Sequence, residues 1–176
     1  MVLVRPEHPD DAIGIRRVNE LAFGRRLEAD LVDDLRRSGC DFQSFVAVED
    51  DGVVGHILFT PVIVTDVDGE TGQGMGLAPM SVRPGRQRQG IGSQLVAWGL
   101  DRLRERGCPF VVVIGHLNYY PRFGFERASI HGLVCQWRDI FADAFMIRVL
   151  DGRRVAGLRG VATYREEFSV SHGGTP

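Results

Sequence analysis

Residues 75–92, MGLAPMSVRPGRQRQGIG, contain in order the patterns of a strand, a polar loop and the start of a helix. Residues 75–82 favour a strand, and a polar loop with several arginines follows them. We expect Gly90 to open a helix that ends at Gly107, because apolar residues recur in between at helical spacing. The continuous apolar run Phe110–Ile114 is typical of a strand that is buried on both faces. This order predicts a strand, helix and parallel strand at the centre of an α/β fold.

Elements on both sides of this unit complete the expected fold. Before it, the sequence predicts a strand at 2–5, then two helices, and then a hairpin of strands 42–48 and 53–64. The apolar face of the first helix consists of Ile15, Val18, Leu21 and Ala22, and that of the second consists of Leu27, Leu31 and Leu35. After it, we expect a helical turn at 119–123 and β-rich runs at 133–137, 144–150 and 160–164. Pro79 predicts an interruption in its strand, because proline lacks the N–H that a sheet ladder uses.

Length and composition indicate one soluble globular domain. A chain of 176 residues can bury a core of its own, and 44% hydrophobic with 25% charged residues is ordinary for a folded protein. We expect a single domain over residues 1–168 and a frayed polar tail over 169–176.

Charge and residue usage exclude several functional classes. The net charge of -2 makes nucleic acid an unlikely partner and provides no field for an anionic membrane. The chain contains no lysine, which excludes Schiff-base catalysis and a Walker phosphate loop. Cys40, Cys108 and Cys135 are widely spaced, so they suggest neither a disulfide framework nor a metal site. With no signal peptide and no apolar run of about 18 residues, we expect a cytoplasmic protein without a membrane span.

The glycine loop Gln87, Arg88, Gln89, Gly90, Ile91, Gly92 has the composition of an anion site. Its glycines let the backbone approach a ligand, and the free N–H groups of a first helical turn attract a diphosphate. The alternative is a plain helix start with two packing glycines. A Rossmann fingerprint fits poorly, because it needs a third glycine where Leu95 stands and an acidic residue near His116.

Two motifs in order resemble the GNAT superfamily of acetyltransferases. The loop matches the Gln/Arg-x-x-Gly-x-Gly/Ala signature for acetyl-coenzyme A, and Tyr120, Gly124 and Phe125 match a Tyr-x-x-x-Gly-Phe run that follows the next strand. The resemblance implies a central, mixed and mostly antiparallel sheet with a splayed central strand, flanked by helices. It also implies acetyl-coenzyme A as the co-substrate, with no metal.

The resemblance assigns roles to individual positions. The backbone N–H of Met80 would polarise the thioester carbonyl, and Tyr120 would protonate the departing thiolate. Arg86 or Arg88 would reach the 3′-phosphate. The residues expected to bind the cofactor are Met80, Val82, Gln87, Arg88, Gln89, Gly90, Ile91, Gly92 and Ser93.

The proton acceptor is where this sequence departs from the family. Some relatives carry a glutamate at the place of Gly76, so the proton must leave through water or through Glu28, His56 or His116, which are also the candidates for acceptor binding. We expect direct transfer to a primary amine of a small molecule, protein or peptide, and we disfavour a covalent cysteine intermediate. An acyl-coenzyme A sensor without turnover is the alternative function. Aminoacyl-tRNA as acceptor is disfavoured by charge, and a homodimer is left open.

Overall fold

A computed structural model describes residues 1–50, 52–137 and 141–172. The chain divides into two units. The first unit consists of Met1–Phe59, Ala78–Gly99 and Glu166–Pro176, and the second of Thr60–Leu77 and Leu100–Arg165. Three elements contribute residues to both units: β3 (Gly52–Thr65), β4 (Thr71–Val82) and α3 (Ile91–Glu105).

The first unit is built on three antiparallel strands. β1 (Leu3–Pro6) pairs with β2 (Gln43–Glu49), and β2 pairs with β3 in a register that sets Phe45 opposite Ile57. The expected hairpin is therefore confirmed. Alternation along β3 sends side chains to both faces, and both faces are buried over residues 54–59.

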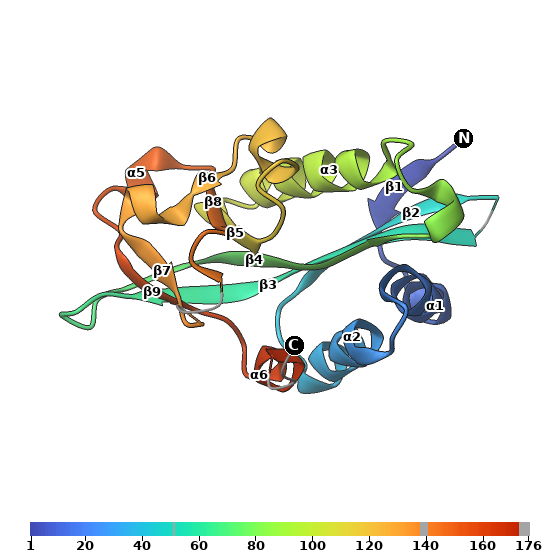
Figure 1. Cartoon of the computed structure of the whole chain (residues 1–176), viewed down its shortest axis with the longest axis horizontal. Helices are drawn as coiled ribbons and strands as arrows, with labels where there is room; N and C mark the ends of the chain where they lie inside the picture. The colour runs from blue at the N-terminus through green and yellow to red at the C-terminus, as the bar shows by residue number, and fades with distance from the viewer. Residues whose placement is uncertain (51, 138–140, 173–176) are drawn as a thin grey trace. The chain divides into compact units, whose positions relative to one another are not determined.

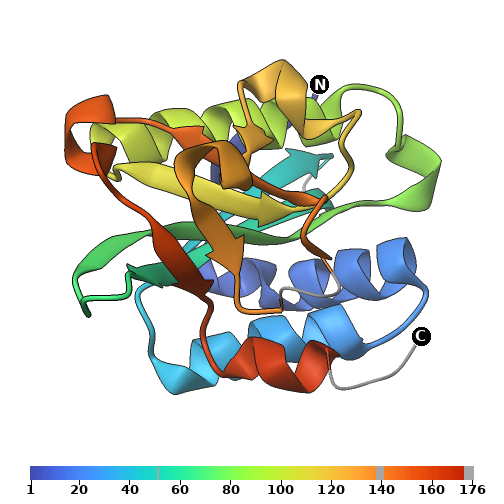
Figure 2. The same ribbon diagram turned by 60° about the vertical axis from the view of Figure 1, so that its left-hand side comes forward.

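Helices lie on both faces of these strands. Figures 1 and 2 show α1 (Ala12–Phe23), α2 (Leu27–Ser38) and α6 (Glu167–His172) together on one face, with η1 (Pro9–Asp11) leading into α1. The start of α3 covers the other face, where a Cβ on Gly55 would lie 2.9 Å from Leu95 Cδ1. Ile15 and Val18 of α1 are buried as expected, whereas Leu21 is 45% exposed because Asn19, and not Leu21, faces the sheet.

The second unit contains the expected pair of parallel strands. β5 (Phe110–Ile114) pairs in parallel with β4, at Met75–Val111 and Gly76–Val112. Its other edge pairs with β8 (Phe145–Val149), which in turn pairs with β6 (Glu126–Arg127), both antiparallel. Residues 110–113 are at most 1% exposed, so the prediction of a strand buried on both faces is confirmed.

The remaining strands and short helices complete the second unit. β9 (Gly160–Thr163) pairs antiparallel with the end of β3 and parallel with β7 (Leu133–Cys135). The short helices there are η3 (Tyr120–Phe123), η4 (Ala128–His131) and α5 (Gly152–Val155). Strand pairing is mixed and mostly antiparallel, and helices flank the strands, so the expected fold class is confirmed.

Two details differ from the sequence-based expectation. β4 runs on through the cis Ala78–Pro79 bond to Val82, so Pro79 does not end the strand. Its parallel ladder with β5 ends at Gly76 in the described part of the chain, as expected for a strand that splays from its neighbour. Residues 169–172 belong to α6, which packs beside α2 and contributes the buried Phe168, while 173–176 lie outside the described residues.

Candidate functional site

The backbone of the loop between β4 and α3 is shaped to hold an anion. Arg88 and Gly90 adopt φ values of 59° and 85°, on either side of Gln89. Left-handed residues that alternate with right-handed ones turn successive N–H groups toward one side, and a left-handed residue other than glycine is uncommon away from functional sites. Gln94 donates the first α3 hydrogen bond to the Gly90 carbonyl at 3.0 Å, so the amides of residues 91–93 have no partner within the helix. These amides and the helix dipole favour a negative group.

Side chains brace this loop from within. Gln87 Nε2 donates to the Val82 carbonyl at 3.0 Å, which ties the loop to the end of β4. Arg86 Nη1 donates to Gln89 Oε1 at 2.6 Å, and the same guanidinium pairs with Glu49. Arg88 is exposed, and no ion pair is recorded for it among the described residues. Of the two arginines expected to meet the 3′-phosphate, Arg88 is thus the one whose charge is uncommitted.

Two of the residues expected to bind the cofactor lie on the strand that precedes the loop. Met80 and Val82 are half-buried on β4, and Ser93 is half-buried in the first turn of α3. Ser81, between the two strand positions, is 3% exposed, and its hydroxyl has no hydrogen-bond partner among the described residues. All nine residues expected to bind the cofactor lie in the first unit.

The place of the missing carboxylate is filled by other side chains. A Cβ on Gly76 would lie 2.6 Å from Tyr164 Cε1 and 2.8 Å from Val62 Cγ2, closer than real Cβ contacts. Burial raises the pKa of the Tyr164 phenol well above its usual value, with a smaller effect from Cys135 and Tyr120. Tyr164 is therefore neutral at ordinary pH and cannot replace the carboxylate as a base.

Tyr120 lies in η3 of the second unit and is 7% exposed. Its ring is packed edge-on against Tyr119 and Phe125, with centroids 5.1 and 5.6 Å away. Gly115 is required beside it, because a Cβ there would lie 2.3 Å from the Tyr120 ring. Burial raises the pKa of the Tyr120 phenol, and Tyr119 raises it further. The phenol keeps its proton and can donate a hydrogen bond.

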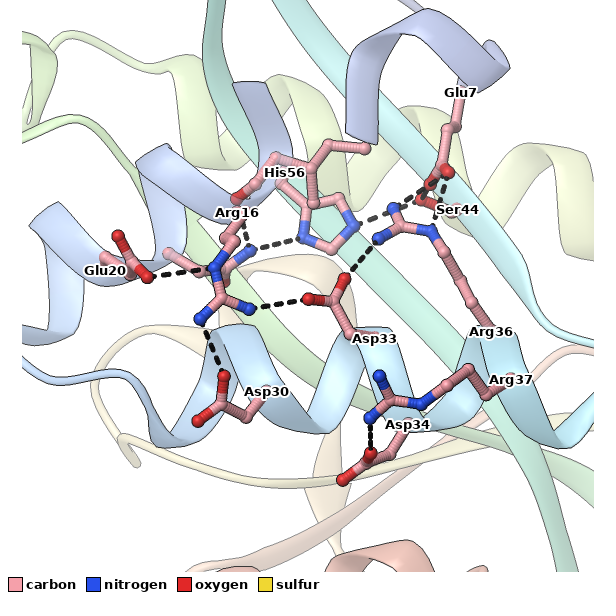
Figure 3. A network of polar contacts seen from close by, with 12 residues as sticks. Glu7, Arg16, Glu20, Asp30, Asp33, Asp34, Arg36, Arg37, Ser44 and His56 are labelled. Carbon is pink, nitrogen blue, oxygen red and sulfur yellow. Dashed lines mark hydrogen bonds and ion pairs between the residues drawn. The ribbon is translucent and has the colours of Figure 1, made fainter. Parts of the chain in front are cut away.

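His56 is fully buried in the first unit and belongs to the polar network in Figure 3. Asn19 Nδ2 lies 3.1 Å from Nδ1 of its ring, and Ser44 Oγ lies 3.1 Å from Nε2. Ser44 donates in turn to Glu7, whose carboxylate pairs with Arg36 at 2.8 Å. Since the Asn19 amide donates to Nδ1, the proton of the neutral ring is on Nε2 and is donated to Ser44.

The charge state of His56 follows from this burial. Loss of solvation, and to a smaller extent the charge of Arg36, lowers the pKa of His56 to about 3. In the described conformation the ring is neutral, has both nitrogens occupied and has no exposed surface. The structure thus places His56 in the core, away from any acceptor in solution.

The two other candidates for acceptor binding differ in exposure. Glu28 lies in the first turn of α2 and pairs with the exposed Arg25, and its own side chain is 13% exposed. His116 follows β5 and is exposed, and its carbonyl accepts hydrogen bonds from the amides of Tyr119 and Tyr120 at 2.9 and 3.3 Å. Glu28 lies in the first unit and His116 in the second.

Sequence reasoning missed two features of these sites. Glu49, at the end of β2, contacts the loop through Arg86, and Tyr164 fills the space above Gly76. Both contacts join residues that are far apart in sequence, so no short sequence motif predicts either of them. In the described part of the chain, no helix is long and apolar enough to cross a membrane, and no three His, Cys, Asp or Glu residues form a group that could hold a metal ion.

Comparisons with known proteins point to one family of acetyltransferases. The family model "Acetyltransferase (GNAT) family" matches residues 14–125. The N-acetyltransferase YhbS of Escherichia coli K12, whose activity is uncharacterised, is 40% identical over 169 residues, covering 96% of this chain and 99% of the relative. The crystal structure of E. coli YhbS in complex with CoA superposes with a TM-score of 0.88 over 96% of this chain and 92% of that one. A GNAT acetyltransferase from Brucella melitensis in complex with acetyl-CoA is 34% identical, with a TM-score of 0.77 over 96% and 98% of the two chains.

Proposed function

Because the family model and a full-length relative at 40% identity show that this chain belongs to the GNAT family of acetyltransferases, we propose that it transfers an acetyl group from acetyl-CoA to a primary amine. The amine attacks the thioester directly, while both substrates are bound. The acceptor is an amine on a small molecule or on a protein or peptide. The three free cysteines support a reducing compartment, the cytoplasm.

The observation that carries this proposal is the anion-binding backbone of residues 87–93. Left-handed residues at Arg88 and Gly90 and the free amides at the start of α3 fit a pyrophosphate. Arg88 adds an uncommitted positive charge for the 3′-phosphate. The two relatives crystallised with CoA or acetyl-CoA support the same ligand.

The thioester is held on β4. We assign polarisation of its carbonyl to the backbone N–H of Met80 and a contact with the pantetheine arm to Val82, as the resemblance implies. A donor aimed at an oxyanion lowers the barrier to the tetrahedral intermediate. Gln87 supports this assignment, because its hydrogen bond to the Val82 carbonyl fixes the end of the strand.

Tyr120 serves the leaving group as a hydrogen-bond donor. Its raised phenol pKa makes full proton transfer to a thiolate unfavourable, because the thiol is the stronger acid. A hydrogen bond from the Tyr120 hydroxyl still stabilises the departing thiolate, and solvent then completes its protonation.

The proton of the acceptor leaves through water. Gly76 provides no carboxylate, Tyr164 is neutral, and His56 is buried with a lowered pKa. The exposed His116 and the half-buried Glu28 stay candidates for binding the acceptor near that water. A cysteine intermediate is disfavoured, because burial raises the pKa of both Cys108 and Cys135 and so suppresses the reactive thiolate.

Calorimetry and thiol release test the proposal together. We expect acetyl-CoA to bind the wild type, and the folded Gly90→Trp variant to lose binding, because its bulk blocks close approach to the amides. The wild-type enzyme, supplied with acetyl-CoA, should release free CoA when a panel of amines is added. Binding without release on any amine would favour the sensor function, and unchanged affinity in Gly90→Trp would remove the loop from the site.

A further inference from the structure

The carboxylate of Glu49 lies beside the anion-binding loop, where its charge repels an anionic ligand. Glu49 is the last residue of β2, and its Oε1 pairs with Arg86 Nη2 in η2 (Pro84–Arg86). The side chains of Arg86 and Glu49 are 33% and 22% exposed, so water screens this pair only in part. By its charge alone, Glu49 would weaken the binding of a phosphate to the loop. Only a second effect of Glu49 that strengthens binding would offset this repulsion.

Arg86 connects Glu49 to the centre of the loop, because it contacts both Glu49 and Gln89. Its Nη1 donates to Gln89 Oε1 at 2.6 Å, and Gln89 Nε2 donates to the Gly85 carbonyl at 3.3 Å. Gln89 is the residue between the two left-handed positions, Arg88 and Gly90. The chain of contacts from Glu49 therefore ends on the segment whose amides point at the ligand.

A backbone contact anchors the same loop to the same hairpin. The Arg83 N–H donates to the Val54 carbonyl of β3 at 2.9 Å, and the Arg86 N–H closes the turn on the Arg83 carbonyl at 2.8 Å. Figure 1 shows this loop next to the end of the β2–β3 hairpin, within the first unit. The loop is thus held at its base by a backbone contact and at its centre by Glu49 through Arg86.

We propose that Glu49 is a positioning residue that shapes the loop for acetyl-CoA before the ligand arrives. Arg86 is the link and does not contact the phosphates, while Arg88 does. Order that exists before binding need not be created on binding, which strengthens affinity without a new contact. This inference rests on the proposed function, because it names acetyl-CoA as the ligand of the loop.

The opposite assignment, with Arg86 as a phosphate ligand, predicts an effect of opposite sign. In that case Glu49 competes with the ligand for Arg86, and removing its charge should tighten binding of the anion. With Glu49 as a positioning residue, the same change should weaken binding. The isosteric substitution Glu49→Gln separates the two, because it keeps the size of the side chain and removes only the charge.

The experiment compares Glu49→Gln, Arg86→Met and their double variant by calorimetry with acetyl-CoA. We expect each single variant to raise Kd about 3- to 10-fold and the double variant to match Arg86→Met, because Glu49 acts on the loop only through Arg86. With saturating acetyl-CoA, kcat should stay near that of the wild type while KM for acetyl-CoA rises. Asp101→Asn is the matched control, since it neutralises one carboxylate of an exposed α3 pair with Arg104 and should leave Kd unchanged.

Hydrogen exchange provides a readout that needs no ligand. The hydrogen-bonded amides of Arg86, Gln87 and Gln94, which flank the free ones, should exchange faster in Glu49→Gln than in the wild type, while those of β5 stay protected. Equal or tighter binding of acetyl-CoA by Glu49→Gln, or unchanged exchange in the loop, would overturn the positioning role. If the wild type does not bind acetyl-CoA at all, the proposed function fails instead, and the exchange measurement still decides whether Glu49 orders the loop.

Discussion

Acidification should destabilise the protein through His56. The pKa of this ring is about 3 in the folded chain and near 6.5 when the chain is unfolded. A lowered folded pKa means that between these values the unfolded state binds the proton and the folded state does not. The contribution of the neutral His56 ring to the free energy of unfolding is therefore fully present above pH 6.5 and is lost progressively as the pH falls toward 3.

The size of the loss follows from the two pKa values. At pH 5 the unfolded ring is about 30-fold more often protonated than neutral, which favours unfolding by about 2 kcal/mol. No screening by solvent reduces this effect, because the side chain has no exposed surface. For a chain of this length, about 2 kcal/mol corresponds to a fall in Tm of about 4–8 °C.

The assay is urea unfolding at pH 7 and pH 5 for the wild type and for His56→Gln. Glutamine retains an acceptor and a donor for Asn19 and Ser44 but does not titrate. We expect the variant to be less stable at pH 7 and to lose about 2 kcal/mol less than the wild type on acidification. Other titrating groups, Glu7 included, contribute equally to both proteins and cancel in the comparison. Equal losses in the two proteins would show that His56 already takes up a proton in the folded state.

Two further predictions concern the chemistry of the site. Tyr120→Phe should lower turnover by up to about 100-fold, because it removes the donor to the thiolate, and should leave Tm and acetyl-CoA affinity nearly unchanged, because the packed ring remains. Wild-type turnover in that variant, measured where chemistry limits the rate, would make Tyr120 a packing residue. Gly76→Glu should lower stability by about 3 kcal/mol or more, because its side chain would overlap Tyr164 and bury a carboxylate. A stable and faster Gly76→Glu enzyme, assayed by denaturation and CoA release, would contradict this account.

The elements with a strong local pattern could be predicted from the sequence. The apolar stripe of α3 and the continuous run of β5 gave their positions, and the glycine loop between β4 and α3 is present as expected. α6 was missed, because a six-residue helix is stabilised by packing of Phe168 beside α2 and not by a periodic pattern of its own.

The site was predictable only where a backbone motif defines it. Glycine positions report the shape of the chain, so an unusual backbone in residues 87–92 could be expected from their order alone, and the structure has left-handed residues there at Arg88 and Gly90. The state of a side chain depends on its neighbours in space. His56 is indistinguishable in sequence from an exposed histidine, and its lowered pKa comes from burial among other elements and, to a smaller extent, from the charge of Arg36. The link between Glu49 and Arg86 was hidden for the same reason.

The discontinuous make-up of the first unit has a consequence for protein synthesis. Its helices α1 and α2 and its strands β1 and β2 leave the ribosome early, but α6, which carries Phe168 and packs beside α2, comes from the segment that begins at Glu166. All residues of the second unit are translated in between. Domains generally fold as units during translation. The first unit can therefore be completed only after the second has been translated, and until then the face of α2 that receives α6 is exposed to solvent.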